Sequence, residues 1–464
     1  MKAHAKIKGL AWLEKSTLSQ LCQYLCKNKL TIIPKVNTTY ADPNPIRLFA
    51  NTDNWLGVPR GFLVQHENDR EMFPDGVEYE IDLPTSYEQM SITDSSVVLR
   101  PHQQLAYDDL TSAMFSQVSQ RGFFGGLLEA YTAFGKSLTS TVTCISQRER
   151  TIVFVHRLAL ADQWKEDINK FFPGLDVGIV GGGKKDWKNK DVVIAVMQTL
   201  YRMDKSKMGA EFFRNFGTVV VDEVHVTGAP MFASSIPNFE SRRILGVSGT
   251  MRRADGCENV FKYLIGDVVH SATGDGRLHP LIWVRDTHFV PDYPVDHLEK
   301  PFLLNLLSEQ KERTAMIAFD IFTAYKKKRH VLVLSERLKI LNDLPMLVDH
   351  FCEKEGVVKP SHGFYIGKKK QAQLEEAAAS DIVYASMQLA KEGIDIERLD
   401  FLALVTPVSD PEQAIGRICR TLKGKPKPVV ADYVDFALVR PRAQYYKRLK
   451  LYRRLGWEVI EPKK

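Results

Sequence analysis

The chain alternates short, continuously apolar runs with longer amphipathic stretches, and this alternation limits the possible folds more than any other feature. The runs are rich in β-branched residues and recur from about residue 124 to residue 436, as in Thr151–Val155, Val192–Met197, Thr218–Val221, Val331–Leu334 and Phe401–Val405. A strand that is apolar along its whole length is buried on both faces, as in a parallel sheet covered by helices. The pattern therefore predicts an α/β protein.

Two α/β lobes are expected rather than one, because each half of this region contains five or more strand–helix units. The loop Ser271–Pro280, rich in Gly, Asp and Thr, is the natural boundary between them. Before the lobes, an amphipathic helix near Leu18–Lys29 and strand-like pieces broken by Pro and Gly predict a small α+β domain. We expect an N-terminal accessory domain at 1–92, lobes at 93–275 and 276–437, and a basic, aromatic C-terminal helix at 438–464.

Positive charge gathers at the C-terminal end. The net charge is +7, and Thr421–Lys464 holds 12 Lys and Arg against 4 Asp and Glu. A basic segment on a nearly neutral body is typical of a protein that contacts a polyanion in one region. The alternative is a solvated helix face, with Leu449, Tyr452 and Leu455 packing the helix on a lobe.

Membrane and secretory signals are absent from the sequence pattern. No apolar run approaches the ~18 residues needed to span a bilayer, and Met1–Leu13 lacks the apolar core of a signal peptide. Cys22 and Cys26 are four residues apart, which fits one helix face better than a zinc site. A cytoplasmic protein with packed, reduced thiols is expected, with no membrane partner.

The segment Glu129–Ser137 follows an apolar strand and precedes a helix, and it approximates the phosphate-binding pattern G-x4-G-K-[ST]. Ala130 stands at the first glycine of that pattern, whereas Gly135, Lys136 and Ser137 match it. In such loops, backbone N–H groups and a helix N-terminus surround phosphates. We expect Lys136 to reach the β- and γ-phosphates of ATP and Ser137 to bind Mg²⁺.

A second chemical signal is an acidic pair at the end of the apolar strand Val219–Val221. Asp222 would hold Mg²⁺, and Glu223 would orient and deprotonate the attacking water. A strand that ends in a solvated acidic pair is the structural alternative. It is disfavoured because Asp222 follows Lys136 by 86 residues, enough for the intervening strands of one lobe.

The sequence Asp222-Glu-Val-His225 resembles the DExH box of superfamily 2 helicases, and further segments resemble that family's motifs in the family's order from Val97 to Asp435. They include Leu99–Gln103, His156-Arg157 with Leu160 and Gln163-Trp164, Ala195–Leu200, Ser248–Thr250, Leu332–Ser335, Ser386–Gln388, Glu392–Asp395 and Gln413–Arg420. His156 replaces the family's usual proline. The resemblance implies two RecA-like lobes with parallel sheets flanked by helices, beside the N-terminal α+β domain.

The resemblance also implies roles for individual residues. The nucleotide would be bound by Arg100, Gln103, Thr132, Gly135, Lys136, Ser137, Gly393 and Asp395. Nucleic acid would be contacted, mostly at its phosphates, by Arg157, Gln198, Thr199, Ser335 and Ser386, although each could instead be a turn or cap residue. ATP hydrolysis would be coupled to strand movement by His225, Ser248 and Thr250.

The last motif supplies catalytic groups from the second lobe. Gln413, Arg417 and Arg420 are spaced i, i+4 and i+7, which predicts one stripe on a helix. An arginine inserted at a γ-phosphate can be worth ~10³–10⁵ in rate. The site would then be complete only when the lobes close.

Within the superfamily, the chain most resembles phage-encoded branch-migration DNA helicases of the UvsW-like group, and also the RecG and XPB types. This implies a DNA-dependent ATPase that unwinds or branch-migrates forks and four-way junctions in replication, recombination or repair, in the cytoplasm of a bacterial host if phage-encoded. An RNA helicase and an ATP-gated remodeller that does not unwind remain alternatives.

Overall fold

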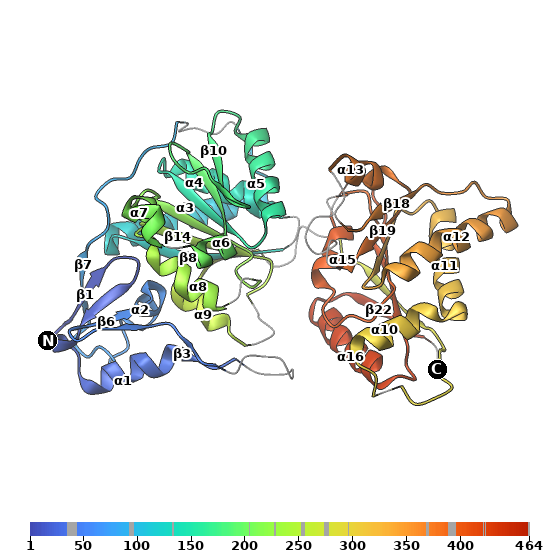
Figure 1. Cartoon of the computed structure of the whole chain (residues 1–464), viewed down its shortest axis with the longest axis horizontal. Coiled ribbons are helices and arrows are strands. Elements are labelled where there is room, and N and C mark those ends of the chain that lie inside the picture. Colours follow the sequence, from blue (N-terminus) through green and yellow to red (C-terminus); the bar gives the residue numbers. More distant parts are fainter. Residues whose placement is uncertain are drawn as a thin grey trace. The chain divides into compact units, whose positions relative to one another are not determined.

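A computed structural model shows two compact units, Met1–Gly274 and Asp275–Lys464 (Figure 1). The structure describes residues 1–34, 44–91, 97–131, 134–203, 205–226, 229–251, 256–272, 278–295, 297–367, 371–387, 396–420, 422 and 424–462. Within these ranges, no helix has the length and apolar character needed to cross a membrane.

The described part of the first unit contains an eight-stranded sheet in the order β11-β10-β12-β9-β13-β14-β8-β15, parallel except for the short β11. Its strands are β8 (Phe124–Ala130), β9 (Thr151–Val155), β10 (Val177–Gly181), β11 (Lys184–Lys185), β12 (Val192–Val196), β13 (Thr218–Asp222), β14 (Arg243–Ser248) and β15 (Val268–Ala272). Every residue of β9, β12 and β13 is buried, as the continuous apolar runs predict.

Helices and one 3₁₀ turn connect these strands. They are α3 (Pro101–Arg121), α4 (Lys136–Ser146), α5 (Leu158–Phe171), α6 (Met197–Arg202), α7 (Lys205–Arg214), α8 (Ala229–Ser235), η2 (Ile236–Asn238) and α9 (Glu258–Leu264). Helix α3 begins with Pro101, whose fixed φ suits a first helical position, and ends at Gly122 in the left-handed conformation. It packs on β8 and β15, whereas α5 packs on β10 and β12.

The described part of the N-terminal region forms a five-stranded sheet in the order β5-β6-β2-β1-β7 and a two-stranded β3-β4 pair. Its elements are β1 (Ala3–Ile7), β2 (Ala11–Glu14), η1 (Lys15–Thr17), α1 (Gln20–Lys29), β3 (Thr31–Ile32), β4 (Ile46–Arg47), β5 (Ala50–Asn51), β6 (Trp55–Val58), α2 (Arg60–His66) and β7 (Val77–Ile81). The predicted α+β composition is therefore observed. Helix α1 is capped by Ser19, whose side chain accepts the Cys22 N–H, as serine caps commonly do.

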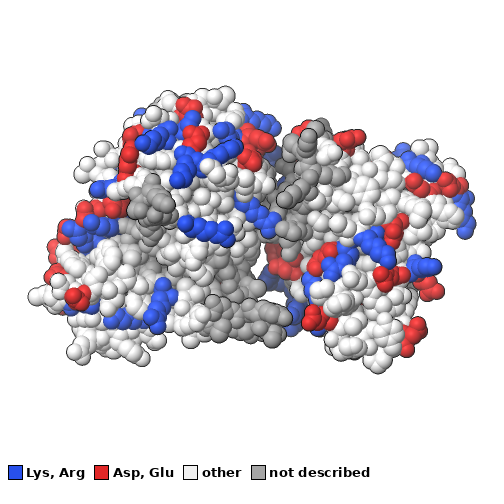
Figure 2. Space-filling model, viewed as in Figure 1, with Lys and Arg blue, Asp and Glu red and all other residues white. Residues whose placement is uncertain are grey.

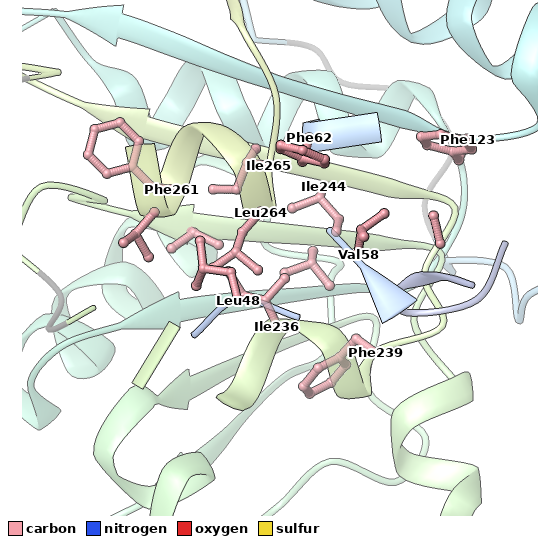
Figure 3. Close-up of a cluster of buried hydrophobic side chains, with 14 of the residues drawn as sticks. Leu48, Val58, Phe62, Phe123, Ile236, Phe239, Ile244, Phe261, Leu264 and Ile265 are labelled. Atoms are coloured by element: carbon pink, nitrogen blue, oxygen red, sulfur yellow. The ribbon is translucent and has the colours of Figure 1, made fainter. Parts of the chain in front are cut away.

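The N-terminal region and the first lobe share one hydrophobic core. Figure 3 shows Leu48, Val58 and Phe62 among Ile236, Phe239, Ile244, Phe261, Leu264 and Ile265 of the lobe, all of them buried. Helix α2 contacts α9, and the ring of Phe62 meets that of Tyr263 edge-on at 5.1 Å. Residues 1–92, which the sequence suggests as a domain of their own, belong to the first compact unit.

Polar contacts secure the same interface. The fully buried guanidinium of Arg60 donates to the Ser241 carbonyl at 2.8 Å, and the Gln65 amide donates to Asp267 at 2.8 Å. A Cβ at Gly61 would lie 2.6 Å from the Tyr263 carbonyl oxygen. Glycine is therefore required where α2 meets the backbone at the carboxyl end of α9.

The described part of the second unit is built on a seven-stranded parallel sheet in the order β18-β19-β17-β20-β21-β16-β22. Its elements are β16 (Leu281–Asp286), α10 (Lys300–Glu309), α11 (Lys311–Lys326), β17 (Val331–Ser335), α12 (Leu338–Glu355), β18 (His362–Tyr365), α13 (Gln371–Ala379), β19 (Ile382–Ser386), β20 (Phe401–Leu404), α15 (Glu412–Ile418), β21 (Val429–Val434), α16 (Val439–Arg454) and β22 (Glu458–Ile460). Apart from the consecutive helices α10 and α11, the described helices and strands largely alternate along this unit, as its sequence predicts.

The C-terminal helix is shorter than the predicted 438–464. Helix α16 ends at Arg454, and β22 then adds a strand beside β16. Leu449 and Tyr452 are buried against the lobe, and the Arg448 guanidinium donates to both carboxylate oxygens of Asp432, at 2.9 and 2.8 Å. This segment is therefore an integral part of the second lobe.

Candidate nucleotide-binding site

The candidate ATPase residues follow three neighbouring strands of the first sheet. Strands β13, β14 and β8 are adjacent and parallel. The carboxyl end of β13 carries Asp222, that of β14 carries Ser248, and β8 leads into the loop before Lys136. Parallel strands end at the same edge of a sheet, which is where open α/β sheets bind ligands.

The loop after β8 turns into helix α4 at Gly135, whose φ is +87°. The Gln103 amide donates to the Phe134 carbonyl at 2.8 Å, and its oxygen accepts the Arg100 N–H at 2.9 Å. A Cβ at residue 135 would collide with the same Gln103 amide. Gln103, predicted to bind the nucleotide, joins this loop to the start of α3 in the structure, and its side chain is buried.

Lys136 and Glu223 form an ion pair, with the lysine Nζ 3.2 Å from the Glu223 Oε1. Burial alone would raise the pKa of Glu223, but Lys136 and His225 outweigh that effect, so its pKa is lowered. Glu223 also has a φ of +47°, a conformation that costs energy in residues other than glycine. The structure thus holds an ionised carboxylate in a strained backbone position beside the lysine.

Asp222 lies beside this pair, but its pKa is shifted in the opposite direction. Burial and the neighbouring Glu223 raise the pKa of Asp222 to about 6. The indole N–H of Trp164 donates to its Oδ2 at 2.9 Å. Trp164 belongs to the helicase-like segment that starts at His156-Arg157, yet nothing in the sequence spacing reveals this bond to a residue 58 positions later.

The predicted coupling residues are also in contact. The His225 Nδ1 lies 2.6 Å from the Ser248 hydroxyl and 3.2 Å from the Glu223 Oε2. Ser248 donates to the Thr250 carbonyl at 2.8 Å. A histidine, the candidate base and the loop after β14 therefore form one connected group.

Glu129 is a residue that sequence reasoning missed. Its carboxylate accepts the Met251 N–H at 3.3 Å and the Ser271 hydroxyl at 3.0 Å. It thereby joins the end of β8 to the loop after β14 and to β15. Only its place just before the phosphate-binding loop could have suggested such a role.

Three of the predicted nucleic-acid contacts lie at the carboxyl ends of adjacent strands in the first lobe. Arg157 follows β9 and precedes the first residue of α5. Gln198 and Thr199 lie in the first turn of α6, directly after β12, which pairs with β9. Gln198 is exposed and Thr199 is half-buried. The structure therefore brings these residues to one edge.

Ser335 in the second lobe does not fit its predicted role. It is fully buried, and its hydroxyl donates to the Arg337 carbonyl at 3.0 Å and accepts the Arg337 N–H at 2.9 Å. It is a turn residue, because the chain must reverse between β17 and α12. Ser386 ends the neighbouring strand β19, opposite Ser335 in the register, and is half-buried.

The predicted helical stripe in the second lobe is shorter than expected. Gln413 and Arg417 lie in α15, but this helix ends at Ile418, so Arg420 lies beyond it. The stripe prediction was therefore wrong for Arg420, because the helix stops before its next turn. Burial lowers the pKa of Arg420 to about 10, which leaves it charged at neutral pH. Thr132, Gly393 and Asp395 lie outside the described residues.

Basic and acidic side chains are interspersed on the face of each unit that is visible in Figure 2. In the second unit, Arg453 lies 3.4 Å from Glu461, and Arg454 lies 3.4 Å from Glu412. These contacts partly offset the positive charge of the C-terminal segment. Its contact with a polyanion therefore stays a prediction.

Comparison with known proteins relates the first lobe to one family. Residues 96–253 match the family model described as the res subunit of type III restriction enzymes. The putative ATP-dependent RNA helicase L396 of Acanthamoeba polyphaga mimivirus is 27% identical over an alignment of 428 residues that covers 88% of this chain and 77% of the relative. The probable helicase D10 of Escherichia phage T5 is 26% identical over 343 residues, covering 72% of this chain and 73% of that protein.

Solved structures extend the likeness to both units. A variant of Saccharomyces cerevisiae Dbp5 bound to RNA and ADP BeF3 aligns with 78% of this chain and 94% of its own, at 13% identity and a TM-score of 0.52. T4 UvsW aligns over 99% of both chains, at 16% identity and a TM-score of 0.41. The Dbp5 likeness shows the fold.

Proposed function

Because this chain is an ATP-dependent helicase of superfamily 2, we propose that it is a DNA motor that unwinds or branch-migrates forks and four-way junctions. One observation supports the proposal that the motor is driven by ATP. Lys136, Asp222 and Glu223 lie together at one edge of the first sheet, and the Lys136 Nζ is 3.2 Å from the Glu223 Oε1. The narrower substrate rests on the motif resemblance to phage-encoded branch-migration helicases.

The residues at this edge fit ATP with Mg²⁺. Bound Mg²⁺ neutralises charge that develops on the phosphates. The start of α4 offers backbone N–H groups that have no partner within the helix, and Lys136 lies in its first turn. Ser137 and Asp222 supply the hydroxyl and carboxylate oxygens that Mg²⁺ prefers.

The other residues then have distinct tasks. Phosphates would replace Glu223 as the partner of Lys136. Glu223, whose pKa is lowered by Lys136 and His225, would then accept a proton from water. His225 touches both Glu223 and Ser248, so a change at Glu223 reaches the loop after β14. We propose that this loop couples hydrolysis to movement.

Nucleic acid would lie along the carboxyl ends of β9 and β12, where Arg157, Gln198 and Thr199 are found. Guanidinium, amide and hydroxyl groups suit phosphate oxygens, which carry no base identity. A motor that holds phosphates can follow any sequence. Moving a branch point exchanges one base-pair step for another of similar stacking energy, ~1.4 kcal/mol on average, so the ATP cycle mainly supplies direction.

An RNA helicase is the second candidate. It is favoured by the mimivirus relative, which is described as a putative ATP-dependent RNA helicase. The phosphate contacts proposed above would serve either polymer.

The deciding experiment compares ATPase stimulation and strand separation on forks, four-way junctions, blunt DNA duplexes and RNA duplexes. We expect junctions and forks to be processed fastest, with Lys136→Ala as the inactive control. Faster unwinding of RNA than of any DNA substrate would replace the DNA proposal with the RNA helicase. Stimulated ATPase without strand separation on any substrate would indicate a remodeller.

A further inference from the structure

A buried tryptophan contacts the candidate metal ligand from outside the ATP-binding motifs. The Trp164 Nε1 donates to the Asp222 Oδ2 at 2.9 Å, and the two residues are 3% and 8% exposed. An indole N–H can only donate, and buried donors are rarely left without an acceptor. The bond therefore ties the Asp222 carboxylate to the position of the indole ring.

Trp164 lies on a helix that starts at a candidate nucleic-acid contact. Helix α5 begins directly after Arg157, and Trp164 follows about two turns later. The helix packs on β9, β10, β12 and α4, and the indole ring is buried among Val153, Ile168 and Val220. Since packed helices move as rigid pieces, a shift at the start of α5 also shifts the Trp164 N–H.

We propose that Trp164 is a positioning residue that orients Asp222 for Mg²⁺, and that α5 thereby transmits nucleic-acid contact at Arg157 to the nucleotide site. The inference rests on the proposed function. Groups that hydrogen-bond to a metal ligand set its orientation, and their removal typically costs ~10–100-fold in metal affinity or activity. A tryptophan that only fills the core would not have that effect.

Trp164→Phe tests the bond, because it keeps an aromatic ring and removes the N–H. Trp187→Phe is the matched control, since Trp187 is also buried in the first lobe but packs against Phe212. Calorimetry with Mg²⁺ and ADP should show ~10–100-fold weaker Mg²⁺ binding for Trp164→Phe. Trp187→Phe should stay within about 2-fold of the parent. Equal Mg²⁺ binding by the two variants would overturn the proposal.

The second half of the test concerns the nucleic-acid link. The ratio of stimulated to basal ATPase, measured at saturating Mg²⁺, should fall for Trp164→Phe and not for Trp187→Phe. An unchanged ratio would show that α5 does not transmit nucleic-acid contact at Arg157 to the nucleotide site. If Trp164→Phe does not fold, the link can be tested in the parent protein labelled with ¹⁵N-tryptophan. Mn²⁺ with ADP should broaden the Trp164 indole resonance. A DNA fork alone should shift the same resonance. An indole signal that the fork leaves unmoved would overturn the link.

The proposed function and this inference fail differently. A parent protein that binds no Mg²⁺ with ADP and hydrolyses no ATP would refute the proposed function. A parent protein that does both, with a Trp164→Phe variant equal to it, would refute only the inference.

Discussion

At the scale of residues, the candidate nucleotide site holds two adjacent carboxylates whose pKa values are shifted in opposite directions. The pKa of Glu223 is lowered by Lys136 and His225 despite its burial, whereas burial and Glu223 itself raise that of Asp222 to about 6. Neighbouring acids whose pKa values diverge commonly have different tasks in one reaction. This supports Glu223 as the proposed base and Asp222 as the proposed metal ligand.

Substitutions at Glu223 and Lys136 separate hydrolysis from binding. Glu223→Gln keeps the side-chain shape and removes the base, so turnover should fall by ~10²–10⁴ while ATP still binds. Lys136→Ala removes the phosphate contact and should weaken ATP binding as well. Turnover and equilibrium ATP affinity, measured with saturating DNA, distinguish the two. Glu223→Gln turning over at the parent rate would show that Glu223 is not the base.

The pKa of Asp222 predicts a pH dependence of Mg²⁺ binding. A carboxyl with a pKa of about 6 becomes protonated as the pH falls through that value, and Mg²⁺ must then displace the proton. Mg²⁺ affinity, followed by calorimetry with ADP, should be nearly constant above pH 7 and fall up to ~10-fold per pH unit below about 6. Asp222→Asn should bind Mg²⁺ weakly and without this dependence. A parent curve as flat as that of Asp222→Asn would contradict the assignment.

At the scale of elements, the interface between α2 and α9 makes the N-terminal region part of the first lobe. Phe62 is fully buried in the shared core (Figure 3). Removing its ring would therefore leave a cavity between the N-terminal region and the first lobe. This argues against residues 1–92 as a separable accessory domain. A deletion of 1–92 would expose Ile236, Ile244 and Leu264 to water.

Phe62→Ala should lower the free energy of unfolding of the first unit by ~3–5 kcal/mol. Phe115→Ala is the control, because Phe115 is 77% exposed on α3 and such changes usually stay within ~0.5 kcal/mol. Denaturant unfolding followed by hydrogen exchange should show β1 and β13 losing protection together. If β1 opened alone, with β13 unaffected, the shared core would not be a cooperative unit.

Local periodicity predicts the strands well and the packing between distant segments poorly. The runs that became β9, β12 and β13 were recognisable because they are apolar throughout, and α1 because its apolar spacing is helical. By contrast, the contact of Phe62 with Tyr263 joins residues far apart in the sequence. Tertiary packing determines the burial of Ser335 and the end of α15 before Arg420. The spacing of residues in the sequence does not report on that packing. Sequence motifs therefore located the candidate site but did not reveal Trp164 and Glu129 as its supports.

At the scale of the whole molecule, the proposed reaction needs groups from both compact units. Lys136, Asp222 and Glu223 belong to Met1–Gly274, whereas Gln413, Arg417 and Arg420 belong to Asp275–Lys464. We therefore expect ATP turnover to depend on residues of both units.

Arg420→Ala tests this expectation. If Arg420 meets the γ-phosphate mainly in the transition state, turnover should fall by ~10³-fold or more, with a much smaller loss of ATP affinity. DNA binding without nucleotide and thermal stability should be nearly unchanged. A general loss in all assays would indicate a structural arginine, and unchanged turnover in a folded variant would leave Arg417 as the candidate.

The shared core also affects how the chain folds during its synthesis. Phe62 leaves the ribosome long before Ile265, and at ~5–20 residues per second the delay is roughly tens of seconds. Throughout that interval, Leu48, Val58 and Phe62 lack the lobe residues that cover them in the native protein. The N-terminal region should therefore remain a client of ribosome-associated chaperones until β15 has been translated, and translational pauses before residue 265 should increase aggregation of the nascent chain.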